Sequence, residues 1–139
     1  MCQTNKEKMV RQIAKEDIVC YKIVIEDGNN LYTLYQRMEV ELGKHYKDKY
    51  KITQFYNCWH NVWKIEEGGF HSYRNKKWAE VIFRCSTTDW FSQLLHKNLK
   101  LVECIIPKGT AYYEGYFDND INEETYVSKE IVYKQIIAE

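Results

Sequence analysis

The sequence predicts a single α+β domain with a mainly antiparallel sheet of about five to seven strands and two short helices packed on one side. Its 139 residues are the length of one domain. β-Branched and aromatic runs, typical of strands, dominate both halves of the chain. Between these runs, residues 75–97 carry the apolar spacing of helices. We expect residues 1–16 to form an N-terminal arm or short helix, and residues 17–139 to form the domain.

The first half of the chain predicts a hairpin. Residues 18–25 are a β-branched run, residues 27–30 read Asp-Gly-Asn-Asn, and residues 31–36 resume the strand pattern. Before the hairpin, the weak apolar spacing of residues 9–14 is that of a short helix. After it, residues 50–56 and 61–65 are further strand candidates.

Two helices are expected in the middle of the chain, at about residues 75–84 and 89–97. Asn75 is a suitable N-cap for the first, and an apolar stripe that includes Trp90 marks the second. A strand, a turn at Pro107 and Gly109, and a second strand then cover residues 99–117. Residues 126–137 are ambiguous, and the β-branched residues 131–133 favour a strand.

Composition excludes several classes of function. Twenty basic and twenty acidic residues cancel, so the chain lacks the basic stripe of nucleic-acid-binding proteins, and nucleic acid is a disfavoured partner. No apolar run is long enough to span a membrane, and no signal-peptide pattern follows Met1. Five cysteines without such a signal predict free thiols in a reducing cytosol, with Cys20, Cys85 and Cys104 as small core residues.

The first candidate site is the segment from Gly68 to Arg74. Paired glycines allow close backbone approach, and His71, Tyr73 and Arg74 come together just before a helix start. A helix N-terminus attracts anions, so this corner suits a phosphate or carboxylate. The alternative is an ordinary strand-to-helix turn with a solvated histidine.

The twelve tyrosines and four tryptophans extend this hypothesis, because aromatic rings with a polar group suit binding surfaces. We include Tyr113 and Trp59 among the candidate ligand-binding residues. A tyrosine-rich sheet is the alternative explanation of the same composition.

No metal site is predicted. Cys58, His60, His71 and Cys85 are ligand types for zinc, but no C-x-x-C pair accompanies them. Glu103 alternates with apolar residues on a predicted strand and faces either solvent or a cleft. No second acid is paired with it locally, and no nucleotide-binding or hydrolase motif is present, so no catalytic residue is assigned from the residues alone.

Residues 103–110, Glu-Cys-Ile-Ile-Pro-Lys-Gly-Thr, resemble the late strand and turn of ADP-ribosyltransferase domains. Residues 86–88, Ser-Thr-Thr, are similar to that superfamily's Ser-Thr-Ser strand. Tyr21-Lys22 stands where the superfamily has Tyr-Arg. The resemblance implies an enzyme that uses NAD, with Glu103 in the catalytic position.

The wider layout resembles small uncharacterised proteins of bacteriophages and bacterial mobile elements. Its features here are Tyr21 at the first strand, the Gly-Phe-His segment 69–71, the Ile-Pro-Lys-Gly turn 106–109 and residues 127–131. This resemblance implies a phage or mobile-element context and carries no activity.

Three functions follow as expectations. The first is a small non-enzymatic binding protein without a cofactor, located in the host cytoplasm. It would bind a host protein or a nucleotide-like anionic ligand and thereby counter host defence. The second is an NAD-using, ADP-ribosyltransferase-like enzyme with Glu103 as the catalytic acid. The third is a structural phage component that forms a homo-oligomer, since zero net charge does little to oppose self-association.

Overall fold

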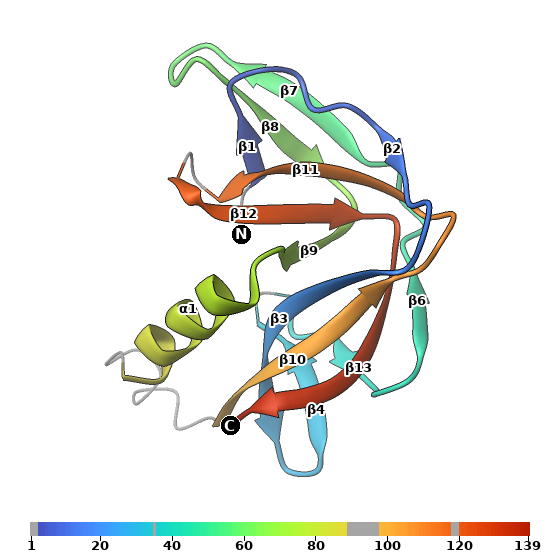
Figure 1. The fold of residues 1–139 in the computed structure, drawn as a ribbon, viewed down its shortest axis with the longest axis vertical. Helices are drawn as coiled ribbons and strands as arrows, with labels where there is room; N and C mark the ends of the chain where they lie inside the picture. Colours follow the sequence, from blue (N-terminus) through green and yellow to red (C-terminus); the bar gives the residue numbers. More distant parts are fainter. Residues whose placement is uncertain (1–2, 35, 89–97, 118–119) are drawn as a thin grey trace.

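The computed structural model describes residues 3–34, 36–88, 98–117 and 120–139. In this part of the chain, thirteen strands form one antiparallel sheet, and a helix, α1 (Lys76–Thr88), lies beside it (Figure 1). The strands in chain order are β1 (Gln3–Asn5), β2 (Gln12–Ile13), β3 (Ile18–Asp27), β4 (Asn30–Thr33), β5 (Glu39–Val40), β6 (His45–Lys47), β7 (Thr53–Asn57), β8 (Val62–Glu67), β9 (Phe70–Tyr73), β10 (Asn98–Ile106), β11 (Ala111–Phe117), β12 (Asp120–Ser128) and β13 (Glu130–Ala138).

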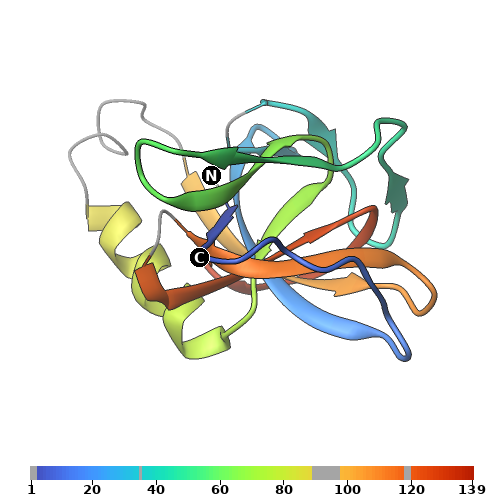
Figure 2. The ribbon, with the colours of Figure 1, turned by 90° about the horizontal axis from the view of Figure 1, so that it is seen from above.

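The sheet consists of two halves that meet at β3 and β9. Its order is β6-β13-β10-β3-β9-β12-β11-β1-β8-β7; in addition, β4 pairs with β3, β5 with β4 and β2 with β11. At the junction, β3 and β9 share the register pair Tyr21 and Tyr73. Figure 1 shows β3, β10 and β13 on one side, β11, β12, β1 and β8 on the other, and β9 between them. In the turned view of Figure 2, α1 lies to one side of both sets of strands.

The predicted α+β class, with about five to seven strands and two helices, is wrong. Among the described residues there are thirteen strands and one helix. The strands that the sequence did not indicate are short and polar, such as β1, β5 and β6. The partners of β1 and β6 are distant in sequence, with β1 between β8 and β11 and β6 beside β13, so no local alternation marks these two strands. The second predicted helix, residues 89–97, lies outside the described residues.

The N-terminal segment, predicted to be an arm or a short helix, forms strands β1 and β2. The buried Gln3 amide donates to the backbone carbonyl of Tyr113 at 3.2 Å and of Thr125 at 3.0 Å. Met9 is buried, whereas its neighbour Val10 is 72% exposed. The segment is therefore held by hydrogen bonds to the sheet, which apolar spacing alone does not reveal.

Other local predictions are confirmed. The turn at residues 27–30 joins β3 to β4, which pair as a hairpin. The helix begins after Asn75, whose side-chain oxygen accepts a hydrogen bond from the Trp78 amide at 3.1 Å. The Thr110 amide donates to the Pro107 carbonyl at 3.1 Å and closes the turn after β10. β10 pairs with β3 and β13, whereas β11 pairs with β12, β1 and β2, so this turn leads from one half of the sheet to the other.

Alternation along β3 and β10 separates two cores. The main core lies between the halves of the sheet, and the second lies under α1. On β3 and β10, the main-core residues are Cys20, Val24, Val102, Cys104 and Ile106, and the residues under α1 are Tyr21, Ile23 and Leu101. The predicted burial of Cys20 and Cys104 is confirmed, whereas Cys85, also predicted to be buried, is exposed. No helix in the described ranges has the length and apolar character needed to cross a membrane.

The paired glycines before β9 are required by their surroundings, as predicted. Gly68 and Gly69 have φ of 85° and 84°, which side chains rarely adopt. A Cβ on Gly68 would lie 2.7 Å from the Lys51 carbonyl oxygen, and one on Gly69 would lie 2.3 Å from Cγ1 of Val127. The Gly69 amide donates to Oδ2 of Asp48 at 2.6 Å. This turn connects β8 to β9, which pairs with β3 at Tyr73.

Candidate ligand site between strands β3 and β9

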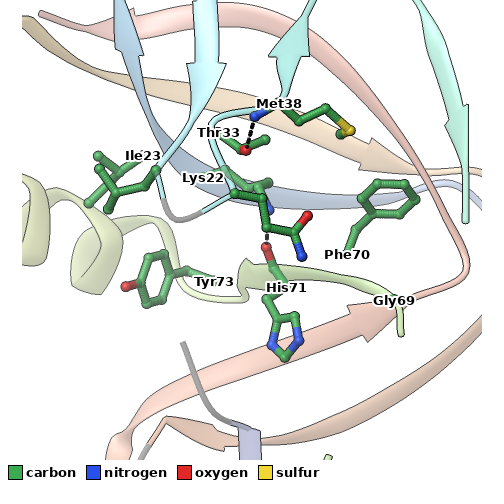
Figure 3. Close-up of a pocket in the computed structure, with 10 residues that line it drawn as sticks. Lys22, Ile23, Thr33, Met38, Gly69, Phe70, His71 and Tyr73 are labelled. Carbon is green, nitrogen blue, oxygen red and sulfur yellow. Dashed lines mark hydrogen bonds between the residues drawn. The ribbon is translucent and has the colours of Figure 1, made fainter. Parts of the chain in front are cut away.

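A cavity of about 180 Å³ lies where β3 leaves β9 and begins to pair with β4. One edge of β3 meets β9 at Tyr21 and meets β4 from Val24 onward. The residues between these points lack a strand partner on that side in the described sheet, and the cavity occupies the gap. Its lining comprises Lys22, Ile23, Thr33, Leu34, Gln36, Met38, Gly69, Phe70, His71 and Tyr73 (Figure 3).

Lys22 is the cationic group of this cavity. It alternates with Cys20 and Val24, so it shares the face of β3 that points into the main core. Its ammonium donates to the backbone carbonyl of His71 at 2.6 Å, across the gap between β3 and β9 (Figure 3). Burial lowers the pKa of Lys22, and the nearby Cys104 and Cys20 act in the opposite direction.

The ammonium of Lys22 is under-satisfied. A lysine has three N–H donors, and the bond to His71 uses one of them. No carboxylate of the described residues forms an ion pair with Lys22. A partly buried cation without a counter-ion loses hydration, and an anion placed beside it would offset that cost. The cavity therefore favours a ligand with a negative charge.

His71 contributes its backbone to the cavity, while its ring points away from Lys22 (Figure 3). Burial, followed by the positive charge of Lys22, lowers the pKa of His71 to about 3. Its Nδ1 is buried and has no hydrogen-bond partner among the described residues. At neutral pH the imidazole is uncharged, so Lys22 is the cation that an anionic ligand would meet.

The loop after β4 forms the outer wall of the cavity. The Met38 amide donates to Oγ1 of Thr33 at 2.9 Å, and the Thr33 amide donates to the Met38 carbonyl at 2.8 Å. Arg37 within this loop has a positive φ of 55°. Gln36 and Met38 are exposed, so the wall is also the boundary between the cavity and solvent. Its side chains can contact a ligand that enters beside them.

The structure does not bring all of the predicted site residues together. His71 and Tyr73 line the β3–β9 cavity. Arg74 lies instead in a second, polar hollow of about 250 Å³ beside β1 and β11. Its guanidinium is 3.4 Å from the Glu124 carboxylate, so its charge is already compensated. At the helix start, the Asn75 side chain already accepts a hydrogen bond from the Trp78 amide.

The remaining predicted residues lie in the lining of neither cavity. Tyr113 packs against the core cluster of Met9, Ile52, Ile65 and Val127. Trp59 is 90% exposed in the turn between β7 and β8. Glu103 accepts a hydrogen bond from Nε2 of Gln135 at 2.8 Å and lies on the face of β10 opposite Val102 and Cys104. It is in the lining of neither cavity.

Lys22 is the site residue that the sequence reasoning missed. It is a lone charge within the apolar run of residues 18–25. Its alternation with Cys20 and Val24 places it on an apolar face, and a lysine in that position is rarely fully buried without a partner. That pattern was the available signal. The structure adds the break in pairing beside it, which the sequence does not show.

No protein-family model, curated protein or solved structure matches this chain. The resemblances to phage proteins and to ADP-ribosyltransferases therefore stay predictions, and the geometry of the cavity is the basis of the proposed function.

Proposed function

We propose that this protein is a non-catalytic binding protein and that its β3–β9 cavity takes a small anionic ligand, with Lys22 as the charged contact. The observation that carries the proposal is a partly buried ammonium with a single hydrogen bond, to a backbone carbonyl, and no acidic partner among the described residues. A carboxylate or phosphate beside Lys22 would use its free donors and compensate its charge.

The size of the cavity narrows the expected ligand. Pockets for drug-sized molecules measure roughly 300–1,000 Å³, whereas this one measures about 180 Å³. A whole nucleotide exceeds that space, so the predicted nucleotide-like ligand would place only its phosphate there. Apolar groups of Ile23, Leu34 and Phe70 line the remainder. A short-chain carboxylate combines the charge and the apolar body that this lining accepts.

The experiment is a titration of the uniformly ¹⁵N-labelled protein with butyrate and, separately, with inorganic phosphate at constant ionic strength. We expect saturable shifts of the amide signals of residues 22–23 and 69–73, lost in Lys22→Met. Lys77→Met is the matched control, because Lys77 is an exposed lysine outside the cavity, and it should bind like the parent. Equal responses of the three proteins, or no saturable shifts with either anion, would refute the proposal.

The biological setting of this binding comes from the resemblance alone. A phage or mobile-element protein that binds a small anion could withdraw a host signal molecule from its target. Binding to a host protein and self-association are separate expectations, and the β3–β9 cavity is evidence for neither of them.

A further inference from the structure

Two cysteines face each other across strands β3 and β10. Cys20 and Cys104 are direct partners in the antiparallel register, and both are fully buried, with 0% exposure. The Cys104 thiol donates to the Val102 carbonyl at 3.8 Å, and each of the two thiols affects the ionisation of the other. Both are free in this structure. Adjacent strands hold opposed side chains about 4.5–5.5 Å apart at Cβ, close to the separation that a disulfide requires.

The groups around this pair come from four strands. Lys22 follows Cys20 on the same face of β3, and Ser72 of β9 lies beside the Cys20 thiol. Tyr133 of β13 is fully buried near both cysteines, and its own pKa is raised by burial and by their proximity. Glu103 precedes Cys104 on β10 and opposes ionisation of that thiol.

This environment distinguishes the two sulfurs. Burial raises the pKa of Cys20, but the Cys104 thiol, the Ser72 hydroxyl and the Lys22 charge outweigh it, and the pKa is lowered. Burial and the neighbouring Cys20 raise the pKa of Cys104 well above its ordinary value. Cys20 is therefore the sulfur that ionises first, and Cys104 keeps its proton. A thiolate next to a protonated thiol is the arrangement of a nucleophilic and a resolving cysteine.

We propose that Cys20 and Cys104 form a redox-active dithiol that a small hydroperoxide converts to a disulfide between β3 and β10. The Cys20 thiolate attacks the peroxide, the O–O bond breaks, and Cys20 becomes a sulfenic acid while the released hydroxide takes a proton to give water. The Cys104 sulfur then attacks the sulfenic sulfur, the S–O bond breaks, and a second water leaves with the Cys104 proton. Two electrons pass from the two sulfurs to one peroxide.

Lys22 links the surroundings of this dithiol to the β3–β9 cavity. It lines the cavity, whereas neither cysteine does, and its charge acts on both sulfurs. Hydrogen peroxide is close to water in size and fits a cavity of about 180 Å³, whereas a peptide disulfide such as glutathione disulfide does not. An oxidant in the cavity must still pass the Lys22 side chain to reach the fully buried sulfurs, and we expect this to favour a small peroxide. This inference is independent of the proposed anion binding, since it needs the cavity only as an entrance.

The test uses full-length protein in which Cys2, Cys58 and Cys85 are replaced by serine, so that only the dithiol remains. After treatment with hydrogen peroxide, the protein is unfolded, alkylated and weighed by mass spectrometry. We expect the loss of two hydrogen atoms, no alkylation, and recovery of both thiols with dithiothreitol. Glutathione disulfide at equal concentration should react at least about tenfold more slowly.

Single variants test the assigned roles. With Cys104→Ala, dimedone should trap a sulfenic acid at Cys20, whereas Cys20→Ala should give no adduct at Cys104. Lys22→Met should slow oxidation by roughly tenfold, because it removes the charge that favours the thiolate. Two outcomes would overturn the inference: both thiols still alkylated after peroxide treatment, or a disulfide that forms equally fast with either oxidant.

Discussion

The ammonium of Lys22 reaches across the gap between two strands and donates to the backbone carbonyl of His71 at 2.6 Å. It does so where β3 and β9 separate, just beyond the register pair Tyr21 and Tyr73. The Lys22 side chain supplies a hydrogen bond to β9 at a point where β9 no longer pairs with β3. The same side chain places a cation with free donors against a cavity. The proposed binding site thus follows from a local break in the sheet.

The acid stability of the protein should depend on His71. Its pKa of about 3 in the folded protein lies below the ordinary 6.5, so folding favours the neutral ring. The resulting stabilisation is complete above pH 6.5 and is lost as the pH falls toward 3, in total about 5 kcal/mol. Urea denaturation of the parent and of His71→Gln between pH 7 and 3 measures this contribution of His71 to the free energy of unfolding.

The variant should lose less stability than the parent over this range, since the carboxylates titrate alike in both. His60→Gln is the control, because His60 is exposed in the β7–β8 turn and should follow the parent curve. A His71→Gln curve parallel to that of the parent would show that His71 is not held neutral by folding.

The Gly69 turn gives a sharp test of packing at the cavity. Gly69→Ala should cost about 2–3 kcal/mol, because its methyl group would overlap Cγ1 of Val127 and its φ is positive. Gly28→Ala shares the positive φ but has open space around it, so it should cost about 1 kcal/mol. Urea denaturation midpoints at pH 7 compare the two variants. Equal losses would mean that the close approach to Val127 is absent.

Asn75 should stabilise the start of α1. Asn75→Ala removes the acceptor for the Trp78 amide and should lower the free energy of unfolding by about 1 kcal/mol. Asn75→Asp keeps the acceptor and should be nearly neutral. Thermal denaturation followed by circular dichroism distinguishes them. If both variants lose the same stability, the loss of the hydrogen bond to the Trp78 amide does not explain the effect of Asn75→Ala.

NAD turnover is the test of the transferase alternative. Glu103 accepts a hydrogen bond from Gln135 and lies outside both described cavities. We therefore expect no consumption of NAD by the parent or by Glu103→Gln. Release of nicotinamide, followed by chromatography, is the measurement. Turnover by the parent that Glu103→Gln abolishes would favour the enzyme over the binding protein.

Local chemistry explains which parts of the fold were predictable. The turn at residues 27–30, the Asn75 cap and the glycine pair at 68–69 each depend on a few neighbouring residues, and each is confirmed. β1 was missed because Gln3 is buried through hydrogen bonds to residues more than a hundred positions away. The number of strands depends on such pairings, so the fold class was predicted wrongly.

The candidate site was predictable only in part, for a related reason. His71 and Tyr73 were found through the Gly68–Gly69 signal, and they line the cavity. Arg74 is adjacent in sequence, yet it lies in the second hollow, where it pairs with Glu124. Lys22 lies 49 residues before His71, on β3. Its place on an apolar face can be read from the sequence, whereas the break in strand pairing beside it cannot.

The most direct measurement of the central claim is the pKa of Lys22 itself, followed by NMR of ¹³Cε-labelled lysine with and without butyrate. Without the anion, the pKa should lie below the ordinary 10.5 because of burial. Bound butyrate should raise it, because the anion binds the protonated amine more tightly than the neutral one. A Lys22 pKa that stays unchanged at saturating butyrate would contradict the account.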